Sequence, residues 1–185
     1  MTNQTFTAGC LELGFSSSLK SLPFKSTFAR KMKVVTQCLC DFLTRTEPRG
    51  LGLKNRGAKS FSIHVSLCGE QRIRTINRDF RGKDKPTDVL SFPMNDNLRG
   101  EDEPLFEMCE IGDIIICSPV MKRQAREFSL TNEEEFFHLL VHGFLHLCGY
   151  DHELSDEEEK LMESFEKKLI RNISKGITNG ILNKN

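Results

Sequence analysis

The strongest local signal in the sequence is a helix whose first and last turns are both specified, between residues 131 and 149. Thr131, followed three residues later by Glu134, is a capping box in which each side chain binds a backbone N–H of the first turn. Gly149 can adopt the left-handed conformation that ends a helix and reverses the chain. The sequence therefore predicts a long helix that stops abruptly at a chain reversal.

Two histidines on this helix and one beyond its end have the spacing of a metal site. His142 and His146 differ by ~40° in azimuth and ~6 Å in rise, so both imidazoles point to one place. His152 lies three residues beyond Gly149, and three residues span up to ~10 Å, enough to return to that place. A lone histidine on an apolar face is more often a core residue, but this trio favours a metal. Three neutral imidazoles leave one tetrahedral position open, which predicts a catalytic site with one Zn²⁺ per chain.

The same histidine spacing occurs in metzincin proteases, so a zinc-dependent peptidase of metzincin-like geometry is an alternative. Those enzymes use the glutamate directly after the first histidine as general base. Here that position is Gly143, which has no group to accept a proton. The peptidase hypothesis therefore lacks its base.

The other elements follow helical or strand patterns, without an internal repeat. Helices are predicted over residues 30–46, 70–80, 118–128 (capped by Ser118) and 155–170, strands over 61–67, 87–92 and 114–117, and a polar loop over 95–110. This order predicts an α+β (mixed α/β) fold, a small mixed sheet packed by several helices, one of them a zincin-like metal helix. We expect a single domain over residues 30–173, a poorly ordered N-terminal tail (1–29) and a disordered C-terminal tail (174–185).

Composition limits the class of protein further. Seven cysteines, an odd number without a C-x-x-C pair, indicate a reducing compartment rather than a disulfide scaffold. No apolar run approaches the ~20 residues of a membrane span. The net charge is zero, but basic residues dominate residues 20–85 and acidic ones the stretch from Glu101 onward. This asymmetry permits a basic face for nucleic acid, or simply solvated helices. The Ser/Thr-rich start faintly resembles an organellar transit peptide but lacks arginine before Arg30, so a cytoplasmic location is preferred.

Three blocks of sequence resemble the YbeY family, the metal-dependent endoribonucleases that mature ribosomal RNA. They are HGFLHLCGYDH (142–152), close to the family pattern H-G-x-L-H-L-x-G-Y-D-H, then RGKDKPTDVLSF (81–92) and IGDI (111–114). The resemblance covers residues 30–170, and Cys148 stands where the family usually has leucine. It implies that His142, His146 and His152 are the zinc ligands.

The resemblance also implies a function. It is that of a single-strand-specific metallo-endoribonuclease in ribosomal RNA processing, at the 3′ end of small-subunit rRNA, and in ribosome quality control. Zinc-activated water would attack the phosphodiester. The implied partners are RNA and the ribosome or ribosome-assembly proteins. A non-catalytic assembly factor, whose metal orders the last two helices, is a further alternative.

By the same resemblance, Arg81 is the family's functionally important basic residue. It lies between a predicted helix and a predicted strand, where a guanidinium can reach a cleft and hold a phosphate through two hydrogen bonds. Arg81 could instead cap the preceding helix or pair with Asp79 or Asp84. The sequence leaves these alternatives open.

Other polar side chains have weaker claims to a role. His138, one turn before the first predicted ligand, could be a spare ligand, although packing is preferred. Asp151 either hydrogen-bonds the site or caps the turn beside it, and Tyr150 is expected to pack over the site. Asp113 is interpreted as an ordinary turn residue, and His64 is given no role.

Overall fold

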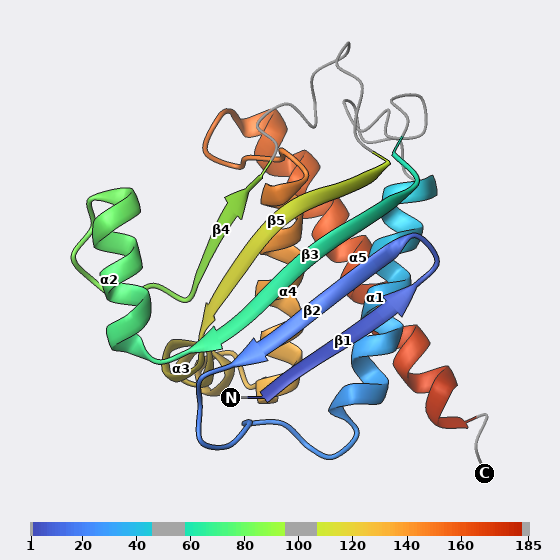
Figure 1. Ribbon diagram of the computed structural model, residues 1–185, viewed down its shortest axis with the longest axis horizontal. Coiled ribbons are helices and arrows are strands. Elements are labelled where there is room, and N and C mark those ends of the chain that lie inside the picture. The colour runs from blue at the N-terminus through green and yellow to red at the C-terminus, as the bar shows by residue number, and fades with distance from the viewer. Residues whose placement is uncertain (1, 46–57, 95–106, 183–185) are drawn as a thin grey trace.

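A five-stranded mixed sheet organises the protein (Figure 1). The computed structural model describes residues 2–45, 58–94 and 107–182. The strand order is β1-β2-β3-β5-β4; the central strands β2, β3 and β5 are parallel, and the edge strands β1 and β4 are antiparallel to their neighbours. The strands are β1 (Thr2–Ala8), β2 (Leu11–Ser17), β3 (Ser60–Cys68), β4 (Val89–Pro93) and β5 (Met108–Cys117). The mixed α/β fold expected from the sequence is confirmed.

Three helices cover one face of the sheet: α1 (Phe28–Arg45), α4 (Asn132–Leu147) and α5 (Asp156–Leu182) (Figure 1). Helix α1 packs against β1 and β2, α4 against β4 and β5, and α5 lies on α1 and α4. The shorter helices α2 (Glu70–Arg81) and α3 (Ser118–Glu127) both contact β5. Among the described residues, no helix is long and apolar enough to cross a membrane. Helix α4 is thus enclosed between the sheet and α5, which fixes it on two sides.

Alternation along the central strands builds the main core between the sheet and its helices. In β2 the side chains of Leu11, Leu13 and Phe15 are at most 1% exposed, whereas the residues between them face outward. The Phe15 ring contacts Phe28 of α1 and Phe136 of α4, with centroids 5.4 and 6.0 Å apart. These aromatic contacts join the second strand to two helices, one of which carries the candidate site.

The N-terminal segment belongs to the sheet, so the expectation of a poorly ordered tail over residues 1–29 was wrong. Strands β1 and β2 form an antiparallel hairpin whose turn places Gly9 at a φ of 55°. The Ser/Thr-rich composition suggested a tail, but the apolar residues of β2 recur at every second position. Such alternation is the pattern of a strand with one buried and one exposed face, and here it outweighs composition.

The C-terminal helix also extends beyond its expected end at Ile170. Helix α5 continues to Leu182, through most of the segment 174–185 expected to be disordered; residues 183–185 lie outside the described residues. Ile173 is buried, and Ile177 packs against the main core one turn later. Apolar side chains at helical spacing therefore hold a segment whose Asn, Lys and Gly content suggested disorder.

Two further boundaries differ from expectation. Strand β5 begins at Met108, inside the expected loop 95–110, of which residues 95–106 lie outside the described residues. Helix α3 is capped by Cys117, and Ser118 is its first residue. By contrast, the capping box at Thr131 is confirmed, because its hydroxyl accepts from Glu134 N–H and the Glu134 carboxylate accepts from Thr131 N–H.

Truncating a core residue of the N-terminal hairpin tests whether that hairpin is integral to the domain. Phe15→Ala should lower the free energy of unfolding by about 3–5 kcal/mol, because it removes a buried ring and leaves a cavity. Thr5→Ala, an exposed change on β1, should stay within about 0.5 kcal/mol. Urea denaturation measures both. Equal stability of the two variants would mean that the hairpin does not fold with the rest.

Candidate metal centre

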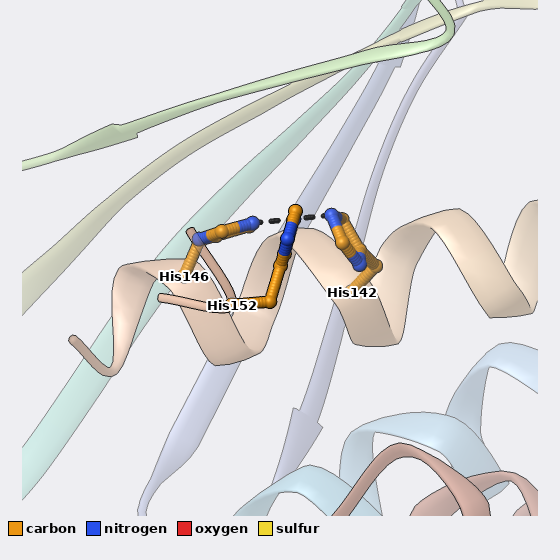
Figure 2. A group of neighbouring side chains, drawn as sticks. All are labelled: His142, His146 and His152. Carbon is orange, nitrogen blue, oxygen red and sulfur yellow. Dashed lines mark hydrogen bonds between the residues drawn. The ribbon is translucent and has the colours of Figure 1, made fainter. Parts of the chain in front are cut away.

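The three histidines singled out in the sequence converge in the structure (Figure 2). Each offers one ring nitrogen, and these nitrogens all lie within 4.8 Å of one another. The Nε2 atoms of His142 and His146 are 3.1 Å apart, and the ring centroid of His152 is 5.4 and 5.3 Å from theirs. Because zinc binds imidazole nitrogen at about 2.0–2.1 Å, nitrogens this close can share one ion.

A glycine turn brings the third histidine back to the helix. Gly149 has a φ of 84°, in the left-handed region expected for it. Its N–H donates to the carbonyl of His146 at 2.9 Å, and Tyr150 N–H donates to that of Leu145 at 3.0 Å. This pair of bonds is the Schellman arrangement, which satisfies the last helical carbonyls while reversing the chain. The three rings accordingly form a triangle, with centroids 4.6, 5.4 and 5.3 Å apart (Figure 2).

The residue after the first histidine faces the sheet rather than the site. Gly143 is buried, and a Cβ built on it would lie 2.9 Å from both Ile114 Cγ2 and Ser91 Oγ. Neither distance is tolerable for a methyl group, so the close packing of α4 on β4 and β5 requires glycine here. A glutamate could not be accommodated without moving the helix. The position used by metzincins for their base therefore has a packing role in this chain.

A carboxylate on α5 orients one of the histidines, and sequence reasoning missed it. Glu166 Oε1 lies 2.7 Å from His142 Nδ1. Ligating histidines usually donate their second N–H to such a group, and that rule could have prompted a search for one. Because α5 carries acids at many positions, only the three-dimensional packing of α5 on α4 identifies the residue.

The environment favours the neutral form that a metal ligand needs. Burial, followed by electrostatic repulsion between a protonated His146 and its neighbours His142 and His152, lowers the pKa of His146 below its usual value. For His142, a proton held on Nδ1 toward Glu166 leaves the lone pair on Nε2, the atom that faces His146. Both imidazoles are thus arranged as neutral groups whose nitrogen lone pairs face the same point.

A cavity of about 710 Å³ opens beside the histidine cluster. Its walls come from the end of α2 and the loop after it, from β4, from α4 and from the turn after α4. The end of α2 and the loop after it contribute three cations, Arg81, Lys83 and Lys85. The carboxylates in the lining are Asp88, directly before β4, and Asp151 and Glu153, in the turn after α4. The cavity therefore combines a candidate metal site with a basic wall that suits an anionic ligand.

Arg81 reaches from the last turn of α2 to the edge of the sheet. Its Nη2 donates to the backbone carbonyl of Ser91 at 3.2 Å, so its bond goes to β4 and not to its own helix. The two neighbouring acids pair with other arginines, Arg78 with Asp79 and Arg74 with Asp84. A guanidinium has five N–H donors, so this arrangement leaves capacity for a phosphate.

Comparisons with known proteins decide the family. The family model described as Endoribonuclease YbeY matches residues 30–174. The chain belongs to the YbeY family. An Aquifex aeolicus relative described as Endoribonuclease YbeY is 40% identical over 127 residues, 69% of this chain and 80% of the relative. One from Sulfurihydrogenibium is 44% identical over 117 residues, 63% of this chain and 73% of the relative.

A solved structure agrees with this assignment. The solution structure of a Thermotoga maritima protein is similar over 91% of this chain and 93% of its own, with 26% identity and a TM-score of 0.55. The resemblance inferred from three sequence blocks is confirmed by the family model. The family motif at residues 81–92 corresponds to the basic wall of the cavity and the edge strand.

Buried polar contacts hold this YbeY motif in place. Asn77 is only 3% exposed. Its side-chain Nδ2 donates to the carbonyl of Lys85, and its backbone carbonyl accepts from Lys83 N–H. Burial alone would raise the pKa of the Asp88 carboxyl, but hydrogen bonds from Gln124, from Val89 N–H and from Thr87 hold it below its usual value. The basic loop is therefore anchored at both ends before any ligand binds.

The remaining candidates are not among the side chains that could hold the metal. His138 is exposed and outside the histidine cluster, and His64 lies on β3, where its Nε2 is 2.9 Å from Ser16 Oγ. Asp151 caps the turn, because its Oδ1 accepts from Glu153 N–H. Tyr150 is buried against the rings of Phe42 and Phe165 and lines the cavity, and Asp113 lies within β5 rather than in a turn.

Removal of one ligand should abolish stoichiometric metal binding. His142→Ala, His146→Ala and His152→Ala should each sharply reduce the zinc bound per chain, since two imidazoles and water bind far more weakly than three. His138→Ala is the matched control on the same helix and should keep about one ion per chain. Elemental analysis of purified protein measures this. Full zinc content in the His152 variant would exclude it as a ligand.

Removal of the orienting carboxylate should weaken binding without eliminating it. Glu166→Gln keeps an acceptor for His142 but loses its charge, and Kd for zinc should rise about 10–100-fold. Glu163→Gln, one turn earlier on α5 and paired with Lys167, should leave Kd unchanged. Competition with a chromogenic chelator gives both values. Equal affinities would show that Glu166 contributes only to packing.

Proposed function

We propose that the protein is a zinc-dependent endoribonuclease that hydrolyses unpaired segments of ribosomal RNA. The observation that carries this proposal is a single cavity that joins the three-histidine cluster to the basic wall of Arg81, Lys83 and Lys85. Relatives described as Endoribonuclease YbeY support the same activity. An RNA substrate would account for both parts of this cavity, because a hydrolytic metal would cut its backbone and the cations would bind its phosphates.

The donor set of the cluster fits zinc. His142, His146 and His152 would hold the ion through three neutral imidazoles, a set typical of catalytic zinc. When bound, Zn²⁺ acts as a Lewis acid and lowers the pKa of water toward ~7, so that hydroxide is available near neutral pH. The carboxylate of Glu166 accepts from His142 and keeps its ring in the orientation and tautomer required for ligation.

The chain's own cations would bind and stabilise the phosphate. Arg81 is held at the cavity wall by Ser91, so its remaining N–H groups can donate to non-bridging oxygens as negative charge grows on them. Lys83 and Lys85 would bind neighbouring phosphates as point charges. An unpaired strand suits the cavity because its backbone can be drawn in without opening a duplex.

A peptidase of metzincin-like geometry is disfavoured by two contacts. The base position is occupied by Gly143, which packs against the sheet. Peptides bind edge strands through main-chain hydrogen bonds, but on the edge strand β4 the Ser91 carbonyl is already the acceptor for Arg81. Both features are compatible with a phosphodiester substrate.

We further propose that the substrate is the 3′ end of small-subunit rRNA and that the protein acts with the ribosome or its assembly proteins, including in ribosome quality control. This proposal rests on membership in the YbeY family. A non-catalytic assembly factor with a structural metal remains the rival. That rival predicts that His152→Ala unfolds the protein, whereas the enzyme should stay folded and lose activity.

The decisive experiment pairs metal loading with RNA cleavage. Chelator-stripped protein, reloaded with Zn²⁺, should cut a 5′-labelled single-stranded RNA, and the same RNA annealed to its complement should resist. Stripped protein should be inactive on both. A zinc-loaded protein that leaves the RNA intact would overturn the proposal, and chelator-sensitive cleavage of casein would favour the peptidase.

Arg81 allows a sharper test of the phosphate contact. Arg81→Lys keeps the charge but loses the bidentate geometry, so the cleavage rate should fall about tenfold or more, and Arg81→Glu should lower it further. Zinc content and melting temperature should change little, because the side chain is exposed. Arg126→Lys, an exposed change on α3, is the control. A destabilised but fully active Arg81→Lys variant would instead assign Arg81 a structural role.

A further inference from the structure

We propose that Phe80 stacks on an unpaired base of the RNA whose phosphate Arg81 binds. The inference rests on the proposed function and deepens it, because it assigns a base-binding position to a cavity that so far has only a metal site and cations. The ligand class is the π-face of a nucleobase, without preference for one base. The occupant is a single-stranded segment that continues out of the cavity.

The ring of Phe80 is largely exposed to solvent, and its contacts within the fold bury only a small part of it. Phe80 is 69% exposed, although it lies one turn beyond the buried residue Asn77 on the inward side of α2. Its contact with the sheet is an edge-to-face arrangement with Phe92, with centroids 5.3 Å apart and planes at 72°. This contact supports one side of Phe80 and fixes its orientation, while most of the ring stays open.

Both aromatic residues are next in the chain to residues that line the cavity. Phe80 directly precedes Arg81, and Phe92 lies between Ser91 and Pro93; all three of these neighbours line the cavity. Adjacent Cα atoms are about 3.8 Å apart, so Phe80 lies within one residue of the phosphate-binding group. A nucleotide with its phosphate on Arg81 can therefore place its base against this ring.

The surroundings match single-stranded nucleic acid better than an apolar partner. Exposed large hydrophobic residues gather around this cavity, since Leu154 lines it and Met94, 55% exposed, follows the lining residue Pro93. The same cavity is lined by the cations Arg81 and Lys83, so apolar and basic groups occur together there. Aromatic rings between cations are the usual device for binding unpaired strands, because bases stack while phosphates pair.

Binding of defined oligonucleotides by zinc-loaded protein on ice, before cleavage proceeds, tests the proposal by fluorescence anisotropy. Phe80→Ala should weaken binding of a labelled oligouridylate about tenfold, the effect expected for one lost stacking contact. An abasic oligonucleotide of the same length should bind the wild type and Phe80→Ala equally, because it has no bases to stack. The slope of log Kd against log salt should be the same for both proteins, since no phosphate contact is lost.

Three further variants separate stacking from other effects. Phe80→Tyr should retain affinity, whereas Phe80→Leu, apolar but without a π-face, should bind like the alanine variant. Phe128→Ala removes another exposed ring (59% exposed), which precedes α4 and lies about 20 Å of helix away from His146, and should bind like the wild type. Circular dichroism and zinc content confirm that each variant is folded and loaded.

The outcomes distinguish this inference from the function on which it rests. If the wild type cleaves single-stranded RNA and Phe80→Ala binds it as tightly as the wild type, stacking is excluded and the nuclease remains. Equal losses on the abasic and the normal oligonucleotide would also exclude stacking, because the effect would then not involve a base. If the wild type neither binds nor cleaves RNA, both proposals fail.

Discussion

The close approach of α4 to the edge of the sheet is the constraint on which the candidate site depends. At Gly143 the helix leaves no room for a Cβ between itself and Ile114 and Ser91. This contact sets the depth of the helix beside β4, and hence the position of His142 and His146 relative to the basic loop. It also removes the catalytic base that the same histidine spacing has in metzincins. One packing requirement therefore both builds the site and limits its chemistry.

The metal site is then held from two further directions. The turn at Gly149 returns His152 to the helix, and α5, packed on α4, supplies Glu166 to His142. Each of these contributions is rigid for a different reason, main-chain hydrogen bonds in the turn and side-chain packing in the helix layer. A metal bound there would meet ligands that are already oriented, which reduces the entropy lost on binding.

The features that could be predicted from the sequence are those that depend on residues close together in the chain. The capping box at Thr131, the chain reversal at Gly149 and the alternation of β3 are local patterns, and the structure has all of them. Glu166 was missed because its role depends on the packing of two helices and not on any spacing along the chain. The hairpin of residues 2–17 was missed for a different reason: composition was given more weight than the period-two pattern of its second strand. The bond from Arg81 to Ser91 likewise required the fold, since sequence alone offered Asp79 and Asp84 as equal partners.

Strand β4 connects these separate features into one surface. Successive residues of a strand point to opposite faces, so Ser91 directs its hydroxyl toward Gly143 of α4 while Phe92 directs its ring toward Phe80 of α2. The Ser91 carbonyl meanwhile accepts from Arg81. The helix that carries His142 and His146, the Arg81 side chain and the exposed ring of Phe80 thus all contact two consecutive residues, about 3.3 Å apart along the strand. This shared support is what a single substrate that carries phosphate and base together would require.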